Sequence, residues 1–122
     1  KKFPDNGPVL DFTVNSASSA ALLFQNGSIW SAYKDTTEFE VVFFRKKAEG
    51  LDVSMISALK PGLFNDVFYL RRHSVQRVLY RNHWPCSDKT KDVEDYFFNP
   101  KDNAVAVKYQ GATSYQGLRC SN

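Results

Sequence analysis

His73 and His83 are the two histidines of the chain, and both lie in a stretch that is rich in arginine. An unperturbed imidazole has a pKa of about 6.5, so it can donate or accept a proton near neutral pH. A neighbouring Arg71 or Arg81 could hold a phosphate. Two imidazoles and a cation are the residues that a small secreted ribonuclease needs for phosphoryl chemistry, which is one option that the sequence leaves open.

Signatures of other enzyme classes are absent from the sequence. It has no Gly-x-Ser-x-Gly, no His-Glu-x-x-His and no glycine-rich loop that could cradle a phosphate. Its two cysteines form no Cys-x-x-Cys and have no neighbouring set of metal ligands. We therefore expect neither a metal nor another cofactor, and we expect binding rather than catalysis.

Aromatic side chains at the ends of the expected loops favour binding. They are interleaved with Asn, Asp, Gln and Arg residues, which gives stacking faces beside planar hydrogen-bonding groups. Such a surface suits a sugar ring or a protein partner. The aromatic residues concerned are Trp30, Tyr33, Trp84, Tyr109 and Tyr115. Trp30 is more simply explained as a core residue, whereas Trp84, held between His83 and Pro85, is the strongest candidate for an exposed contact.

The charges of the chain are clustered. Basic residues gather between Arg71 and His83, and acidic residues follow between Asp88 and Asp95. Solvated faces of neighbouring strands that carry opposite charges would explain this pattern, although a basic pair of strands could also bind a protein. The formal net charge of +3 is too small to indicate nucleic acid, so no nucleic-acid partner is expected.

Cys86 and Cys120 both have polar, turn-like neighbours, which argues against two buried thiols. A disulfide between them is therefore favoured, and two free thiols remain the alternative. Such a bridge would close a loop of about 34 residues and stabilise the fold by about 3 to 4 kcal/mol. The sequence Asn26-Gly27-Ser28 is an acceptor motif for N-glycosylation, and it is also typical of the tip of a type I′ hairpin. Both features predict a secreted or extracellular protein.

The length and composition of the chain set its size class. With 122 residues, 43% hydrophobic and 15% aromatic, it is long enough for one domain and too apolar to be disordered. Its longest apolar runs, at 20–24 and 41–44, are far shorter than the roughly 20 residues that span a bilayer, so no membrane insertion is expected. The chain begins at Lys1 without a methionine, which is typical of a processed product or an excised domain.

Two-residue periodicity dominates the chain and predicts about ten short strands. The clearest signals are two hairpins, at 21–33 around Asn26-Gly27 and at 67–81. The strongest competing signal is at 88–96, where the sequence allows a single short helix. The expected strands cover residues 9–14, 21–24, 28–33, 39–44, 51–57, 67–72, 76–81, 95–98, 104–109 and 115–120. Strands spaced by about ten residues, with turn residues between them, are typical of a sandwich or a small barrel.

Three segments of the chain share a layout of alternating strand, polar gap and aromatic strand. The second segment contains Val53-Ser54, then Phe68-Tyr69-Leu70-Arg71, then Asp95 two residues before Phe97. Over about 45 residues it resembles a repeat of the β-trefoil carbohydrate-binding modules attached to fungal and bacterial arabinofuranosidases. Where that family has a sugar-contacting histidine after the arginine, this sequence has Arg72, followed by His73. The resemblance implies a β-trefoil that binds a sugar.

Together these patterns predict a single all-β domain over residues 1–122, β-trefoil-like or an antiparallel β-sandwich. We expect a secreted, non-catalytic recognition module that binds carbohydrate. Arg72, His73 and Asp95 would hydrogen-bond sugar hydroxyls, and Trp84 would stack on the ring. The alternative is an extracellular protein-interaction domain of the adhesion, receptor or cytokine-like kind, and the third option is the ribonuclease.

Overall fold

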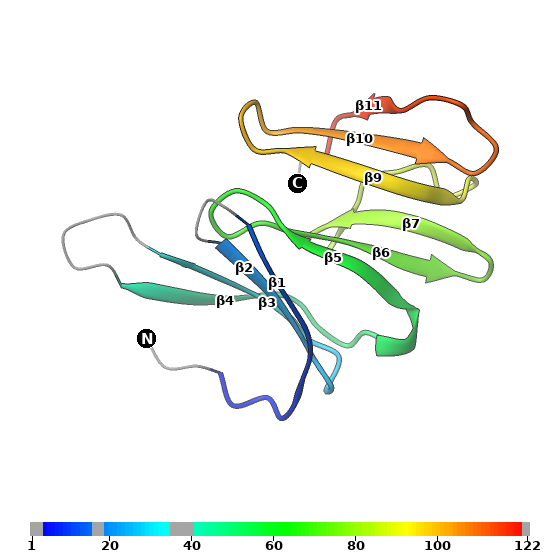
Figure 1. Ribbon diagram of the computed structural model, residues 1–122. Helices are drawn as coiled ribbons and strands as arrows, with labels where there is room; N and C mark the ends of the chain where they lie inside the picture. The colour runs from blue at the N-terminus through cyan, green and yellow to red at the C-terminus, as the bar shows by residue number, and fades with distance from the viewer. Residues whose placement is uncertain (1–3, 16–18, 35–40, 121–122) are drawn as a thin grey trace.

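The computed structural model describes residues 4–15, 19–34 and 41–120, which form three antiparallel β-sheets (Figure 1). The first sheet contains β1 (Val9–Val14), β2 (Ser19–Phe24), β3 (Ile29–Lys34) and β4 (Val42–Ala48), in that order. The second contains β5 (Ile56–Pro61), β6 (Val67–His73), β7 (Gln76–Arg81) and β8 (Trp84–Pro85). The third contains β9 (Val93–Asn99), β10 (Ala104–Tyr109) and β11 (Gln116–Leu118). A 3₁₀ turn, η1 (Val53–Met55), precedes β5.

The second sheet lies between the other two and is buried on both faces. Val67 and Tyr69 of β6 belong to the core shared with the first sheet, whereas Phe68 and Leu70 belong to the core shared with the third. Because side chains alternate along a strand, a strand buried on both sides must be apolar throughout, which explains the uninterrupted run at 67–70. The sheets therefore stack face to face in chain order, as Figure 1 shows.

The all-β prediction is confirmed. Three antiparallel sheets in one small domain are compatible with either predicted architecture, sandwich or trefoil-like, and each face-to-face pair of sheets packs as the halves of a sandwich do. Both predicted hairpins are present, as β2–β3 and β6–β7. Among the described residues no helix is long and apolar enough to cross a membrane.

The turn between β2 and β3 is not of the predicted type I′. That type needs a positive φ at both central residues, and here Gly27 has a φ of 86° while Asn26 is not among the residues with positive φ. Gly27 donates its backbone N–H to the Phe24 carbonyl at 3.0 Å. A Cβ at Gly27 would also lie 2.3 Å from the Leu51 carbonyl oxygen, so the first sheet packs against the 51–52 segment only if this residue is glycine.

Two predicted strands have different limits in the structure. The strand expected at 39–44 is β4, which continues through Arg45 and Lys46 to the buried Ala48, while residues 39–40 lie outside the described part of the chain. An edge strand tolerates cations on its surface, so these charges do not end it. The strand expected at 51–57 begins only at Ile56, because Asp52 accepts the Ser54 N–H at 3.1 Å and caps η1 instead.

The short helix expected within 88–96 is wrong. Asp88 accepts the backbone N–H of Thr90 at 2.9 Å, which makes a tight turn rather than a helical cap. Strand β9 then begins at Val93, and Val93 and Tyr96 are buried in the core shared with the second sheet. Pairing with β10 and burial in the core therefore override the polar residues that suggested a helix.

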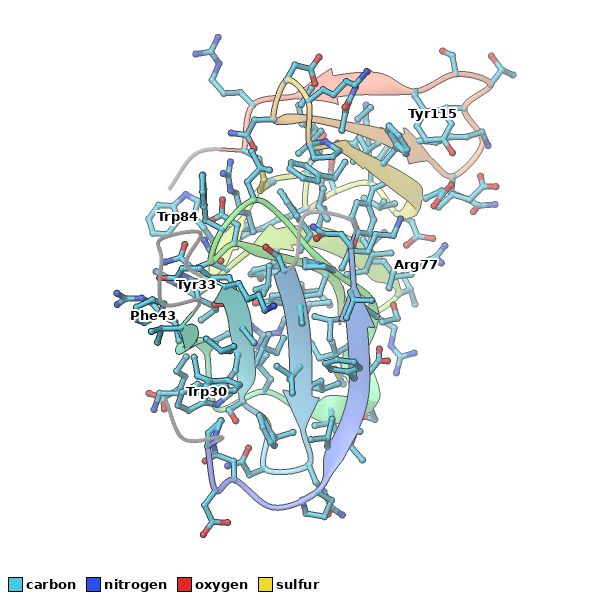
Figure 2. All side chains as sticks on the ribbon, turned by 60° about the vertical axis from the view of Figure 1, so that its left-hand side comes forward. Trp30, Tyr33, Phe43, Arg77, Trp84 and Tyr115 are labelled. Carbon is cyan, nitrogen blue, oxygen red and sulfur yellow. A yellow bond between two sulfur atoms is a disulfide. The ribbon has the colours of Figure 1, made fainter. Side chains whose placement is uncertain are left out.

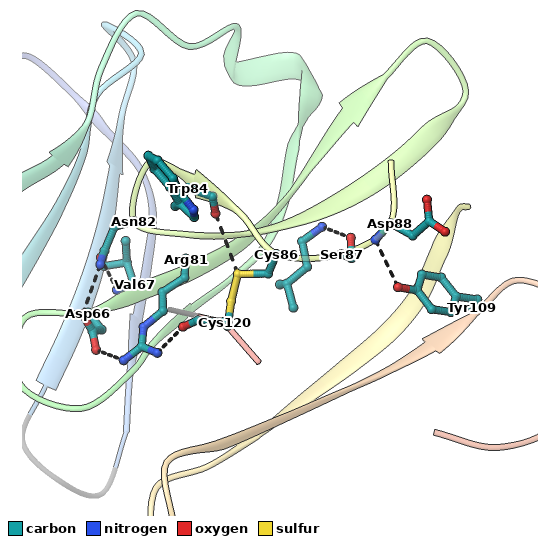
Figure 3. Close-up of a disulfide and its surroundings, with 11 residues drawn as sticks. Asp66, Val67, Arg81, Asn82, Trp84, Cys86, Ser87, Asp88, Tyr109 and Cys120 are labelled. Carbon is teal, nitrogen blue, oxygen red and sulfur yellow. Dashed lines mark hydrogen bonds and ion pairs between the residues drawn. A yellow bond between two sulfur atoms is a disulfide. The ribbon is translucent and has the colours of Figure 1, made fainter. Parts of the chain in front are cut away.

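The predicted disulfide between Cys86 and Cys120 is confirmed (Figure 3). It joins the segment after β8 to the segment after β11, across 34 residues of sequence. Tyr109 supports the same junction, because its hydroxyl accepts the backbone N–H of Asp88 at 3.1 Å. The second and third sheets are thus joined covalently as well as by their shared core.

Candidate functional site

The four predicted binding residues lie in three separate places. Arg72 and His73 are at the end of β6, Asp95 is on β9, and Trp84 begins β8. His73 pairs with Gln76, and Trp84 pairs with Arg81, at opposite ends of β7. A strand rises by about 3.3 Å per residue, so these five steps separate His73 from Trp84 by about 17 Å. The four residues therefore do not form one site.

The His73 side chain contacts Tyr80 on the neighbouring strand of its own sheet. Its Nε2 and the Tyr80 hydroxyl are hydrogen-bonded at 2.7 Å, and the two rings stack with centroids 5.8 Å apart. Desolvation, and then repulsion by Arg71 and Lys89, lower the pKa of His73 below its ordinary value of 6.5. His73 is therefore largely neutral at physiological pH. His83 lies beyond the opposite end of β7, so the two imidazoles are not brought together on one phosphate, as the ribonuclease option would need.

The cluster of basic residues is mostly paired within the protein. Arg77 forms an ion pair with Asp92 at 3.0 Å, which agrees with the interpretation that opposite charges face each other. Arg81 forms one with Asp66 at 2.6 Å. The guanidinium of Arg71 lies over the Tyr80 ring, 5.7 Å from its centroid. The charges of Arg77 and Arg81 are therefore balanced within the protein, whereas a ring contact leaves the charge of Arg71 uncompensated.

Asp95 belongs to a shallow groove on the third sheet. The hydroxyl of Tyr115 donates a hydrogen bond to its carboxylate at 2.6 Å, and this bond is the main reason that the pKa of Asp95 is lowered. Phe97 and Ala106 line the same groove, together with Lys60, whose ammonium lies 4.5 Å from the Tyr96 ring centroid. Asp95 therefore has well-defined neighbours, but none of the other predicted binding residues is among them.

Trp84 presents the exposed aromatic surface that its position in the sequence predicts. Half of the residue is accessible, at 50% exposure, and its ring meets that of His83 edge-on with centroids 5.8 Å apart. In Figure 2 it lies on the same side of the molecule as the stacked rings of Tyr33 and Phe43, opposite Arg77. His83 in turn lines a groove of about 300 Å³ that the end of β4 completes. The other residues of this groove are Lys46, Lys47, Ala48 and Glu49.

The groove beside Trp84 contains both hydrogen-bond donors and an acceptor. Lys46 donates to Glu49 Oε1 at 2.6 Å, which holds the carboxylate in place at the rim. The two side chains are 47% and 70% exposed, so both remain accessible. His83 adds an imidazole, and Lys47 a second ammonium. Side chains of this kind bind hydroxyl groups, and the half-exposed indole beside them can stack on an apolar ring. We name Trp84, His83, Lys47 and Glu49 the Trp84 surface.

Asn82 fixes the turn that carries Trp84. It is buried and has a φ of 59°, a conformation that asparagine adopts more readily than most residues. Its Oδ1 accepts the Val67 backbone N–H at 3.0 Å, its Nδ2 donates to Asp66 Oδ1 at 3.1 Å, and its own N–H donates to the Val67 carbonyl (Figure 3). The turn is therefore anchored to the start of β6.

The disulfide fixes the other side of the same turn. The N–H of Cys86 donates to the Leu79 carbonyl at 2.7 Å, and Ser87 accepts the Leu79 N–H at 2.8 Å. The carbonyl of Cys120, across the disulfide, accepts a hydrogen bond from Arg81. Trp84 thus projects from a turn held on both sides, and little ordering of the backbone would be needed on binding.

The predicted glycosylation residue, Asn26, is exposed at the tip of the β2–β3 hairpin. Its side-chain oxygen accepts the Ser28 N–H at 3.1 Å and the Ser28 hydroxyl at 2.7 Å. Ser28 itself is buried and also accepts the indole N–H of Trp30. The motif thus shapes the turn, and its modification stays a prediction.

Comparisons of this chain with protein families, with curated proteins and with solved structures found no match. Among the described residues no group of three or more His, Cys, Asp and Glu side chains is placed to hold a metal ion. The sequence interpretation missed Glu49, because only the stacking of the first sheet on the second brings the end of β4 to His83. It expected a turn at Asn82 but not the anchoring role of this side chain, because its partners Val67 and Asp66 lie 15 and 16 residues earlier in the sequence.

Proposed function

We propose that this chain is a non-catalytic carbohydrate-binding module that holds a sugar ring against the Trp84 surface. The observation that carries the proposal is the half-exposed indole of Trp84 on a turn braced by Asn82 and the disulfide. Sugar rings present an apolar face that stacks on an aromatic ring, together with hydroxyl groups that need both donors and acceptors.

The roles of the neighbouring side chains follow from their chemistry. Glu49 accepts hydrogen bonds from sugar hydroxyls, and Lys47 donates to them. His83, edge-on to the indole, can do either as a neutral imidazole. This arrangement moves the proposed site away from Arg72, His73 and Asp95, which are too far apart to contact one small sugar with Trp84.

We further propose that the protein works outside the cell or in another oxidising compartment. A disulfide in a small domain is typical of such proteins. Exposed Asn26 would carry an N-linked glycan there. Expression through a eukaryotic secretory pathway should give a product heavier than its sequence mass, and the Asn26→Gln variant should lack the increment. A secreted product of unmodified mass would remove the glycosylation proposal.

A glycan array tests the sugar proposal directly. The wild-type chain should bind a defined set of glycans in both low and moderate salt, because stacking and hydrogen bonds dominate over long-range charge. Titration calorimetry with the best glycan should show at least about a tenfold loss for Trp84→Ala and a smaller loss for Trp84→Phe. Tyr115→Ala, which removes an equally exposed aromatic ring from the third sheet, is the matched control and should bind normally. Binding that Trp84→Ala leaves intact would disprove the proposal, as would an array without any bound glycan.

A further inference from the structure

The outer face of the first sheet is apolar and accessible. Phe12 and Val14 on β1 are 58% and 64% exposed, because both side chains point away from the core shared with the second sheet. Only one face of this sheet packs on another sheet in the described part of the chain, whereas both faces of the second sheet are covered. We name this surface the first-sheet outer face. Its residues are Phe12, Val14, Ala20, Leu22, Ala32 and Val42.

A hollow of about 370 Å³ lies in the middle of the first-sheet outer face. Val14 pairs with Ala20, and Ala20 pairs with Ala32, so two small side chains lie side by side on adjacent strands. Phe12 and Val14 rise on one side of this floor, and Val42 lies on the other. The hollow is therefore lined almost wholly by apolar atoms, and Lys34 at its rim brings a positive charge.

The outer face of the third sheet carries a projecting aromatic ring beside its shallow groove. Phe97 is 59% exposed and pairs with Ala106, which in turn pairs with Gly117. The Phe97 ring thus projects beside two small residues on the neighbouring strands. Asp95 lies on the same strand two residues away and therefore on the same face. We name Asp95, Phe97, Ala106 and Gly117 the third-sheet outer face.

The two outer faces are complementary in shape and in charge. A projecting Phe97 matches an apolar hollow floored by alanines, and the shallow groove beside Phe97 accommodates the ridge formed by Phe12. The carboxylate of Asp95 matches the ammonium of Lys34. Two cations already lie near Asp95, and each has a partner of its own. Lys108 is paired with Glu94 at 2.9 Å, and Lys60 donates to the Tyr96 carbonyl at 3.3 Å.

We infer that the first-sheet outer face of one copy of this chain binds the third-sheet outer face of a second copy, with Phe97 in the hollow. The contact repeats the face-to-face packing that already joins consecutive sheets within the chain. The first and third sheets lie at the two ends of the stack in Figure 1, so no other sheet of the described chain covers either outer face.

A head-to-tail contact of this kind closes into a ring or continues as a chain of copies. Since the described part of each copy forms three sheets, two copies contribute six. Radial β architectures arrange roughly four to eight such sheets around an axis. A closed pair of copies would therefore have a number of sheets that is known to form a ring.

Sedimentation velocity of the whole chain over a wide range of concentrations tests this inference. The wild-type protein should self-associate, and Phe12→Asp and Phe97→Asp should each weaken association by about tenfold or more. Mixing the two variants should restore one heterodimer, because each supplies the face that the other lacks. Val75→Asp, at a 76% exposed turn residue on neither face, is the control and should associate as the wild type does. Circular dichroism should be unchanged in all variants.

Exchange of the charges provides a second test that does not depend on the apolar variants. Lys34→Glu and Asp95→Lys should each weaken association, and the double variant should recover much of it. A wild-type chain that stays monomeric at every concentration would overturn the inference. Self-association that survives Phe97→Asp would also overturn it, because it would show two identical faces in contact. Glycan binding should be the same for Phe12→Asp and Phe97→Asp as for the wild type, so this proposal and the sugar proposal can fail separately.

Discussion

Arg77 and Asp92 are joined by two side-chain hydrogen bonds, from Nε to Oδ1 at 3.1 Å and from Nη2 to Oδ2 at 3.0 Å. Asp92 Oδ1 also accepts the backbone N–H of Arg77 at 2.6 Å. This arrangement fastens the start of β7 in the second sheet to the segment that enters the third sheet. It is a structural bond between sheets rather than a free pair of charges.

Asp92→Ala should lower the free energy of unfolding by about 1 kcal/mol. A bidentate bond to a charged group contributes more than this when buried, but the Arg77 side chain is 37% exposed and water screens the interaction. Urea unfolding followed by circular dichroism measures the change. Asp102→Ala, which alters an exposed carboxylate in the β9–β10 turn, should have almost no effect. Equal stability of the two variants would show that the Arg77–Asp92 pair contributes nothing measurable.

The same pair gives the protein an acid-sensitive component of stability. The hydrogen bonds from Arg77 lower the pKa of Asp92 in the folded state, so the unfolded chain takes up a proton first as the pH falls. The stabilisation is therefore complete above the unfolded pKa of about 3.9 and is lost as the pH falls through the lower, folded value. The Asp92→Asn variant should show a shallower loss of stability than the wild type below about pH 4, when unfolding is measured across the acid range. Parallel curves would contradict this assignment.

Replacing both cysteines by serine should destabilise the protein by about 3 to 4 kcal/mol, since the disulfide closes a loop of 34 residues. Comparison of urea unfolding for the double variant and the wild type measures this difference. Glycan binding by the variant should weaken as well, because one support of the Trp84 turn is removed. An unchanged free energy of unfolding would show that the disulfide does not stabilise the folded state relative to the unfolded state.

Asn82→Ala and Asn82→Gly separate the two contributions of this residue. Both variants lose the hydrogen bonds to Asp66 and Val67, which should reduce stability by about 1 to 3 kcal/mol. The alanine variant should be less stable than the glycine variant by a further 1 kcal/mol or so, because alanine is strained at a φ of 59°. Thermal and urea unfolding give the ranking, and the near-ultraviolet dichroism of Trp84 should weaken in both. The reverse ranking would mean that backbone strain at this turn is unimportant.

His73 should titrate below the ordinary histidine pKa in a nuclear magnetic resonance experiment that follows its ring protons. Because the folded pKa is lowered, the unfolded chain binds more protons near pH 6, so stability rises with pH up to about 6.5. Lys89→Ala removes one of the repelling charges and should raise the pKa of His73 towards its ordinary value. A His73 pKa above 6.5 in the wild type would contradict the environment described here.

The hairpins were predictable because their causes are local. In 21–33 and 67–81 the alternation of apolar residues and the turn residues lie within a few positions of one another, and the strands pair directly. The start of β5 was missed because two hydrogen bonds from Ser54 to Asp52 compete with the strand. The helix expected near 88–96 failed because burial of Val93 and Tyr96 outweighs local preference.

The candidate site was predictable only in part. Trp84 was identified because its neighbours His83 and Pro85 mark a turn, and turns lie at the surface. The separation of His73 from Trp84 follows from the pairing of β6, β7 and β8 in one sheet, so the local strand pattern already argued against grouping them. The position of Asp95 depends instead on how the third sheet stacks on the second. The contact between β4 and His83 depends on the same long-range packing and leaves no mark in the sequence near either residue.

The link between Cys86 and Cys120 also decides how the molecule would bear mechanical load. Tension applied to the two ends of the described chain passes from residue 120 directly to residue 86, because the sulfur bridge is shorter than the 34 residues it spans. The third sheet therefore carries no force while the bridge is intact. When the two ends are pulled apart, the chain should extend by the contour length of the first two sheets alone. The segment between Cys86 and Cys120 should extend only after a reductant has cleaved the disulfide.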